Sequence, residues 1–512
     1  EDASPRFTGC TWRGNAAPGS NGGGGGVNVG GTSPASAASV APVFEQCAFE
    51  SNTALNGGGV FVQEASPRFT GCTWRGNAAS GSNGFGGGGV LVVGSSPASA
   101  ASVAPLFEQC AFESNTALNG GGGVSVQDAS PRFTGCTWRG NTAPGSNGFG
   151  GGVYVQGISP ASAASVAPVF EQCVFESNTA LNGGGMIVLK ASPRFTGCTW
   201  RGNTASGSKG FGGAVSVQGT SPASAASVAP VFEQCTFESN TAPNGGGVFV
   251  QEASPRFTGC TWRGNAATRL GGAIYAEYMQ LPQPPATLTL STCQFLGNTV
   301  TGPGYGGGAI YATRLVPDAP ANLAFLPGTC FAKARGNASG FFSCAIEPGP
   351  GWCCQQPRII ANPPAYVSNA YRRYAYSTLL LFENGVTFDG NSAADPTASG
   401  GALHVEGGGN VTLSGDNVTF RNNRAGLFGG GVYLSSGTAA LQLLGSSRWS
   451  NNTAVGSARG DHLYSASGGS VALGGAALHL NGDPTRVREG IVIGPQAGEV
   501  TWGGAAVTSP HV

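Results

Sequence analysis

The sequence predicts an all-β chain wound into a single-stranded parallel β-helix, that is, a solenoid with loop insertions. Tandem repetition is the first observation behind this prediction. The phrase SPRFTGCTWRGN recurs every 62 to 64 residues, at Ser4, Ser66, Ser130, Ser192 and Ser254. A second phrase, FEQC followed by FESNTA, lies between these copies, so each unit holds two related half-units. Two half-units in every 62 to 64 residues, in a chain with 88 glycines among 512 residues, are typical of a solenoid.

Alternation within one half-unit is the second observation. Cys10 and Trp12 alternate with polar neighbours, and Val27 and Val29 flank an asparagine, which is the period-two pattern of strands with one buried face. A third short strand should contain Phe7, and the asparagine and glycine positions should form the corners. We therefore expect three strands and three corners per coil. Fourteen or so coils at about 4.8 Å each would form a rod roughly 70 Å long.

The repeats divide the chain into three parts. Residues 1–316 are expected to form regular coils, residues 317–377 an irregular cysteine-containing insertion, and residues 378–512 degenerate coils and the C-terminal end. The opening EDASPRFTGC matches QEASPRFTGC further along, so the sequence begins within a repeat and we expect it to be part of a longer protein.

Composition excludes several classes of partner. Lys plus Arg equals Asp plus Glu at 25 each, and only 10% of residues are charged, so no basic surplus is available for nucleic acid. No apolar run reaches the length of about 18 residues that a membrane-spanning helix needs, so no transmembrane segment is expected.

A pairing of FxxN with GGA[ILV] recurs along the chain. It reads FESN with GGGV, FLGN at Phe295 with GGGAI, FDGN at Phe388 with GGAL, and FRNN at Phe420 with GGGV; tryptophan replaces phenylalanine in WRGN. This pattern resembles the repeats of chlamydial polymorphic outer membrane proteins over nearly the whole chain outside residues 317–377. The resemblance implies a right-handed parallel β-helix on a cell surface, typically with a role in adhesion.

A charged column follows the inward ring of each half-unit. Its members alternate in sign from coil to coil: Arg13, Glu50, Arg75, Glu113, Arg139, Glu176, Arg201, Glu238 and Arg263. Opposite charges on neighbouring strands attract weakly and penalise a slip that would stack like charges. We interpret this column as a device that sets strand register, in preference to a charged binding face.

Two further columns should face the interior. The cysteines from Cys10 to Cys293 are expected to act as small buried hydrophobes, with pairwise disulfides in an oxidising compartment as the alternative. The asparagines Asn15, Asn52, Asn77, Asn115 and their successors are expected to form a stacked amide ladder at a corner.

One column is expected to point outward between two buried positions after the glycines. It comprises Asn28, Phe61, Leu91, Ser125, Tyr154, Ile187, Ser216, Phe249, Tyr275, Tyr311, His404 and Tyr433. An exposed stripe of rings suits the apolar faces of sugars, which makes Phe61, Tyr154, Phe249, Tyr275, Tyr311 and Tyr433 a candidate ligand or partner stripe. The alternative is that rings simply favour strands or lie beneath the SPASAASVAP loops.

Enzymatic chemistry has little support in the sequence. A polysaccharide lyase or hydrolase, the alternative function for a β-helix, needs paired carboxylates or a calcium site with a basic residue. The eight aspartates are never adjacent, and the four histidines lie far apart. GPGYGG from Gly302 lacks the helix of a dinucleotide site. We predict no catalytic residue, no cofactor and no metal site.

Two sets of residues favour an extracellular setting. Cys330, Cys344, Cys353 and Cys354 lie within 25 residues and resemble a disulfide-stapled loop. Asn337, Asn410, Asn417 and Asn451 begin N-x-[ST] sequences, which are glycosylated in a eukaryotic secretory route.

These patterns together predict an extracellular or cell-surface β-helix. We expect it to act as an adhesion surface or a rigid structural spacer, with glycans or cell-surface proteins as partners. A passive wall or coat component that associates with itself is a further alternative.

Overall fold

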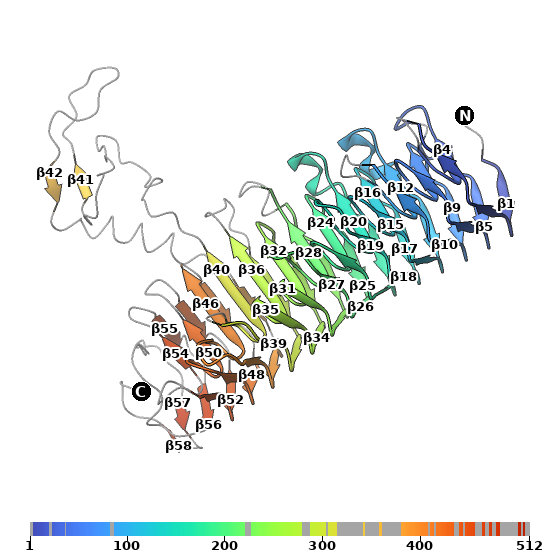
Figure 1. The fold of residues 1–512 in the computed structure, drawn as a ribbon. Helices are drawn as coiled ribbons and strands as arrows, with labels where there is room; N and C mark the ends of the chain where they lie inside the picture. The colour runs from blue at the N-terminus through green and yellow to red at the C-terminus, as the bar shows by residue number, and fades with distance from the viewer. Residues whose placement is uncertain are drawn as a thin grey trace, which may run out of the picture.

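A computed structural model gives the fold of the chain (Figure 1). The residues that it describes are 4–19, 23–35, 37–81, 86–220, 227–278, 287–303, 306–314, 341–343, 358–360, 380–383, 385–407, 410–413, 416–434, 440–443, 446–455, 463–465, 470–473, 478–481, 500–502 and 505–506. Among these residues there is no α-helix, and nearly all regular structure is short strands.

Each regular coil contributes one strand to each of four sheets, and the coils stack one behind another along a rod (Figure 1). The strands of the first two coils are β1 (Arg6–Thr8), β2 (Thr11–Arg13), β3 (Ala16–Ala17), β4 (Val27–Gly30), β5 (Val43–Glu45), β6 (Ala48–Glu50), β7 (Thr53–Ala54) and β8 (Val60–Gln63). Every strand pairs in parallel with its equivalents in the neighbouring coils, as β1 does with β5. The first to fourth sheets contain 14, 16, 13 and 13 strands.

The structure corrects the expectation of three strands per coil. The additional strand is the two-residue segment after the corner asparagine, such as β3 or β7, and it forms a sheet of its own. Two residues are too few to show an alternation of apolar and polar side chains, so the period-two pattern could not reveal this strand.

The stack continues past the region expected to be an insertion. β37 (Leu288–Ser291) pairs directly with β43 (Leu380–Phe382), and β40 (Ile310–Arg314) pairs with β46 (Leu403–Gly407). Between them, β41 (Phe341–Ser343) and β42 (Arg358–Ile360) pair only with each other, and in antiparallel fashion. The coils before and after this region are therefore neighbours in one solenoid.

The C-terminal coils keep the same order with less regular lengths. Their last strands are β52 (Ser447–Ser450), β53 (Thr453–Ala454), β54 (Leu463–Ser465), β55 (Ser470–Leu473) and β56 (Leu478–Asn481). β57 (Val500–Trp502) extends the second sheet in parallel, and β58 (Ala505–Ala506) turns back on it in antiparallel fashion.

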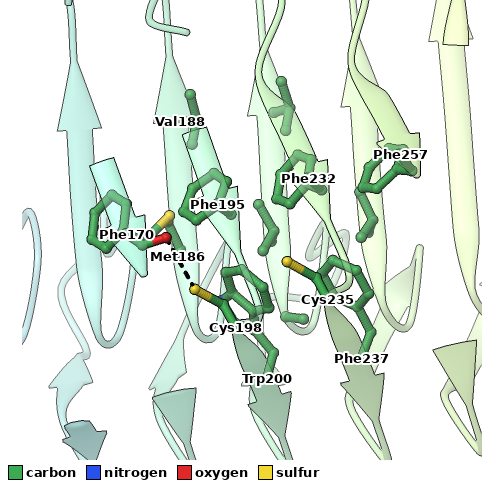
Figure 2. Close-up of a cluster of buried hydrophobic side chains, with 14 of the residues drawn as sticks. Phe170, Met186, Val188, Phe195, Cys198, Trp200, Phe232, Cys235, Phe237 and Phe257 are labelled. Carbon is green, nitrogen blue, oxygen red and sulfur yellow. Dashed lines mark hydrogen bonds between the residues drawn. The ribbon is translucent and has the colours of Figure 1, made fainter. Parts of the chain in front are cut away.

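Two stacks of aromatic rings fill the interior. Phenylalanines of the first sheet stack at centroid distances of 4.5–5.0 Å, as Phe170 does on Phe195 (Figure 2). In the second sheet, tryptophan and phenylalanine alternate, and Trp200 lies 4.9 Å from both Phe175 and Phe237. The two stacks meet edge to face, since the ring of Phe195 lies at 71° to that of Trp200. Each such ring pair adds about 0.5–1.5 kcal/mol to the burial of its apolar surface.

The glycine runs before the fourth sheet have a steric cause at each position, and Gly57, Gly58 and Gly59 illustrate it. Gly57 has a φ of +63°, which glycine adopts without strain. A Cβ on Gly58 would lie 2.4 Å from the carbonyl oxygen of Gly88 in the next coil, and one on Gly59 would lie 2.7 Å from the ring of Trp74. The run therefore brings the backbone close to the next coil and leaves space for its ring.

Two of the SPASAASVAP inserts, those at Ser96 and Ser159, are anchored to the coils. They contain short 3-10 helices, η1 (Pro97–Ala101) and η2 (Pro160–Ala163). A buried carboxylate just after the fourth-sheet strand of the preceding coil holds each of these two segments: Glu64 accepts a hydrogen bond of 2.8 Å from the hydroxyl of Ser99, and Asp128 accepts one of 3.0 Å from the backbone N–H of Ile158. These inserts are thus fixed to the rod at their bases.

Candidate functional surface

The predicted aromatic column exists, but the expectation that it is exposed is wrong. Strand register aligns Phe61, Tyr154, Phe249, Tyr275, Tyr311 and Tyr433 on the outer side of the fourth sheet. Of these, Tyr154, Phe249, Tyr275 and Tyr311 are only 1–6% exposed, whereas Phe61 and Tyr433 are half-buried. A ligand role for this stripe stays a prediction, and its only partly accessible rings are at Phe61 and Tyr433.

Loops between the third and fourth sheets cover these outward rings. Phe211 stacks on Phe249 with ring centroids 4.4 Å apart, and Phe149 lies 6.1 Å from Tyr154 in the same manner. Phe249, Tyr275 and Tyr311 form a small apolar cluster of their own, separate from the interior of the coils. The phenylalanines in the repeated phrase GFGG were the sequence signal for this cover, because each places a ring just before a glycine run.

Polar side chains border the covered rings. The hydroxyl of Tyr154 donates to the side-chain oxygen of Gln156, two residues along the same strand. Burial raises the pKa of Tyr154 above its usual range, and it also raises the pKa of Glu277, which lies beside Tyr275. The hydroxyl of Tyr154 is thus satisfied, and burial disfavours its ionised form.

His404 occupies the same column between two tyrosines. Its ring centroid lies 4.6 Å from that of Tyr311 and 4.7 Å from that of Tyr433. The side chain is buried, and neither ring nitrogen makes a hydrogen bond of good geometry, although the backbone of Ser399 lies near the ring. Burial lowers the pKa of His404 to about 3, so the imidazole is neutral at physiological pH.

The predicted charge column is confirmed as a set of ion pairs between neighbouring coils. Arg75 donates to Glu113 at 2.8 Å, and Arg139 donates to Glu176 at 3.0 Å. A second column, which the sequence interpretation missed, repeats the pattern on the first sheet and includes the pair of Arg132 and Glu171. The missed signal was the arginine of SPRF, which register aligns diagonally with the glutamate of FEQC.

The asparagine ladder is confirmed along the described coils. Each side-chain amide donates to the side-chain oxygen of the next asparagine at 2.8–3.0 Å, as Asn115 does to Asn141 and Asn141 to Asn178. Each amide also donates to the carbonyl oxygen of a ring residue, as Asn141 does to Phe112 at 2.9 Å. The members are Asn15, Asn52, Asn77, Asn115, Asn141, Asn178, Asn203, Asn240, Asn265, Asn298, Asn391, Asn423 and Asn452.

The cysteine column consists of free thiols, so the alternative of pairwise disulfides is wrong for the described residues. Ten cysteines from Cys10 to Cys293 are unbridged, and all but Cys10 are buried. The thiol of Cys198 donates to the carbonyl oxygen of Phe170 at 3.4 Å (Figure 2). Burial raises the pKa of Cys110 and Cys173 well above the usual range of a thiol, which disfavours the reactive thiolate.

Comparison with known families agrees with this architecture. A family model described as a right-handed beta helix region matches residues 1–157 and 98–314, which together span more than half of the chain. The chain belongs to the right-handed β-helix family. A Chlamydia polymorphic membrane protein repeat also matches residues 385–406, whereas a search of curated proteins finds no match.

The short repeat match falls where this right-handed β-helix resumes after β40. It contains Phe388 and Asn391 of FDGN and Gly401 of GGAL. Phe388 stacks between Phe295 and Phe420 in the interior, and Asn391 continues the amide ladder. The residues that carry the resemblance to chlamydial repeats are therefore the residues that fill and turn each coil.

The predicted glycosylation and disulfide sites are only partly described. Asn417 and Asn451 lie at exposed corners with φ values of 64° and 52°. Asn410 begins β47 (Asn410–Leu413). Asn337 and the cysteines Cys330, Cys344, Cys353 and Cys354 lie outside the described residues.

A shallow groove crosses the outer side of the third sheet. It measures about 280 Å³ and is lined by Ala205, Ser206, Thr241, Ala242, Pro243, Ala266, Ala267, Thr268 and Thr301. These small side chains offer no charged or titratable group for chemistry. Within the described ranges, no group of three or more His, Cys, Asp or Glu side chains is arranged to hold a metal ion. No helix long and apolar enough to cross a membrane is found there either.

Proposed function

We propose that this right-handed β-helix acts outside the cell or on its surface, as a rigid spacer that presents an adhesion surface. The matched polymorphic membrane protein repeat supports the cell-surface setting. Exposed asparagines at Asn417 and Asn451, each within an N-x-[ST] sequence, are compatible with secretion. The proposed role is structural and adhesive and involves no catalysis.

One observation supports the spacer role: the asparagine ladder continues across residues 317–377, where the sequence repeats are interrupted. Asn298 donates to Asn391 at 3.0 Å although 93 residues separate them, and Phe295 stacks on Phe388 at 4.8 Å. Bending the rod at this point would separate ring stacks and expose buried amides, each worth about 1–3 kcal/mol when left unsatisfied. The coils on both sides therefore behave as one stiff body.

Adhesion would use the accessible part of the surface. In the aromatic stripe, Phe61 and Tyr433 are the half-buried rings, and a ring with one open face can stack on the apolar face of a sugar. Glycans are therefore the proposed ligand class, with cell-surface proteins as the other type of partner.

The test uses the full chain, labelled and applied to a glycan array and to cultured cells. We expect binding that falls about tenfold or more when Phe61 and Tyr433 are both replaced by alanine, because each stacked ring contributes about 0.5–1.5 kcal/mol. Replacing exposed Lys209 by alanine is the matched control. Absence of binding by the native chain would rule out the adhesive role. Release of reducing sugar from polysaccharides would show that the chain is an enzyme instead.

A further inference from the structure

The outer faces of the first and second sheets carry charge in stripes across the rod. Coils with SPRFTGCTWRGN place two arginines outward, such as Arg132 and Arg139, and we call them arginine coils. Coils with FEQC and FESN place two glutamates outward, such as Glu171 and Glu176, and we call them glutamate coils. The two kinds alternate without exception from Arg6 to Arg263, and we call this surface the striped face.

Both signs of charge are accessible on the striped face. The paired arginine side chains are 51–70% exposed and the glutamates 23–42% exposed. Arg139 donates to Glu176 through its Nε atom, so other guanidinium donors remain directed at solvent. Between the charges lie short outward side chains such as Thr73, Ala111 and Thr137, which allow another surface to approach closely.

The balance of charge decides which partner fits. A polyanion would meet glutamates on every second coil, and a polycation would meet arginines, so a partner of single sign gains little from this face. A partner with the same stripes, displaced by one coil, would place arginines opposite glutamates throughout. The charge pattern thus favours a second copy of this chain.

Symmetry then fixes how two copies meet. A two-fold axis along the rod would set every coil opposite its own equivalent, with Arg139 facing Arg139. A two-fold axis parallel to the strands, midway between an arginine coil and a glutamate coil, reverses one rod and sets unlike coils opposite each other at every step. A parallel shift by one coil would also pair unlike coils, but it leaves an open assembly that grows into filaments.

The size of the striped face suits a dimer. Nine coils at about 4.8 Å, crossed by two short strands and their corner, cover roughly 40 Å by 20 Å. This is about 800 Å² per partner, the area of a standard specific interface. Aliphatic side chains at the edge of the glutamate coils, such as half-buried Leu106 and Val169, would add apolar contact.

We propose that the striped face joins two copies of this chain into an antiparallel, side-by-side dimer in which arginine coils lie opposite glutamate coils. The proposal stands independently of the adhesive role, because it uses different sheets from the aromatic stripe.

The experiment measures self-association of the full chain by sedimentation velocity at low and high salt. We expect a dimer that weakens as salt rises, since charge complementarity is screened. Exchanging the charges of Arg139, Glu176, Arg201 and Glu238 on four successive coils keeps the ion pairs among these four residues. Wherever this block lies opposite unexchanged coils of the partner, it faces like charges. This exchange should weaken dimerisation about tenfold or more.

Two further variants keep the test decisive. Ala111→Tyr changes no charge and should also weaken the dimer, because it adds bulk between the stripes. Lys209→Glu lies on an exposed loop away from the striped face and should have no effect. Thermal unfolding of each variant shows that it is folded.

X-ray scattering distinguishes the arrangement. An antiparallel dimer that overlaps only along the striped face is longer than one rod but well short of twice its length, and it gains cross-section, whereas an end-to-end dimer is about twice as long. A monomer at low salt, an end-to-end dimer, or a dimer insensitive to both the charge exchange and Ala111→Tyr would each overturn the proposal.

Discussion

The coils up to Arg314 and the coils from Leu380 onward share one solenoid but differ in which residues they retain. Both keep the amide ladder and the second ring stack, which continue through Asn391 and Phe388. The cysteine column stops at Cys293, and register places Val386 and Val418 in its position. The comparison separates residues that every coil needs from residues that merely fill space.

The alternating ion pairs, like the cysteines, are not kept in every coil. Beyond β40, a single pair of this kind is found in the described coils, between Arg421 and Asp389 at 2.8 Å. Exposed pairs contribute only about 0–1 kcal/mol each, so their loss from the C-terminal coils costs little stability. The comparison therefore implies that losing the amide ladder costs more stability than losing the cysteine packing.

Breaking the amide ladder should have the largest effect. Asn141→Leu removes the acceptor of both the backbone N–H and the amide of Asn115, and it leaves the carbonyl of Phe112 without its donor. At about 1–3 kcal/mol for each unsatisfied buried group, we expect a loss of about 4 kcal/mol or more. Urea denaturation measures this loss. Asn147→Ala, at an exposed loop position, should change stability by less than about 0.5 kcal/mol.

Adding a side-chain atom where the backbones of neighbouring coils lie close together should have the second largest effect on stability. A Cβ on Gly122 would lie 2.3 Å from the carbonyl oxygen of Gly151 and 2.5 Å from that of Thr142, and neither backbone atom can move without opening the stack. We expect Gly122→Ala to cost about 3 kcal/mol, measured by the same denaturation. Gly30→Ala is the control, because no atom lies within 4 Å of its Cβ position. Equal effects of the two substitutions would contradict the steric explanation.

The third largest effect is a loss of stability at low pH, and it arises in the C-terminal coils, where His404 lies. Folding holds the pKa of His404 at about 3, below its ordinary value of 6.5, so the unfolded chain binds the proton first as pH falls. The stability linked to neutral His404 is complete above about pH 6.5 and declines by about 1.4 kcal/mol per pH unit toward pH 3.

Replacing this histidine should remove that decline. The loss at pH 5 should be about 2 kcal/mol in the native chain and absent in His404→Phe. Burial raises the pKa of Glu277 and Glu406, which opposes the decline in both proteins, so the measured quantity is the difference between them. Hydrogen exchange in β46 and β50 (Val432–Leu434) reports it locally. Parallel pH profiles would show that His404 is not the titrating group.

The sequence was sufficient to predict what repeats along the rod. Rings, cysteines and asparagines recur at fixed positions, so one half-unit predicts the contacts of the next, and Asn115 and Asn141 meet as expected. The alternating charges predicted the pairs on the second sheet for the same reason.

What the sequence could not predict depends on contacts outside one strand. Parity along β20 (Val153–Gln156) shows that Tyr154 points away from the interior, but it does not show that Phe149 covers the ring. Predicting the exposure of a side chain requires knowing where the neighbouring loop lies. The phrase GFGG shows that the loop contains a phenylalanine, but not where its ring packs. The two-residue strands of the third sheet were missed because so short a segment has no period.

The smallest predicted effect concerns cysteine and comes from one C-terminal coil. There the buried indole N–H of Trp449 donates at 3.0 Å to the hydroxyl of Ser447, which occupies the cysteine position of that coil. In the N-terminal coils the indole N–H of Trp138 has no partner, and Cys136 lies two residues before it. A serine at position 136 should therefore supply the missing acceptor.

This hydrogen bond offsets the cost of replacing a buried thiol by a more polar hydroxyl. We expect Cys136→Ser to change the free energy of unfolding by less than about 1 kcal/mol. Cys173→Ser places the same hydroxyl before Phe175, which has no N–H to donate, and should cost about 1 kcal/mol more. Urea denaturation of both variants measures the difference. If the two substitutions cost the same, the unpartnered indole is not what distinguishes tryptophan coils from phenylalanine coils.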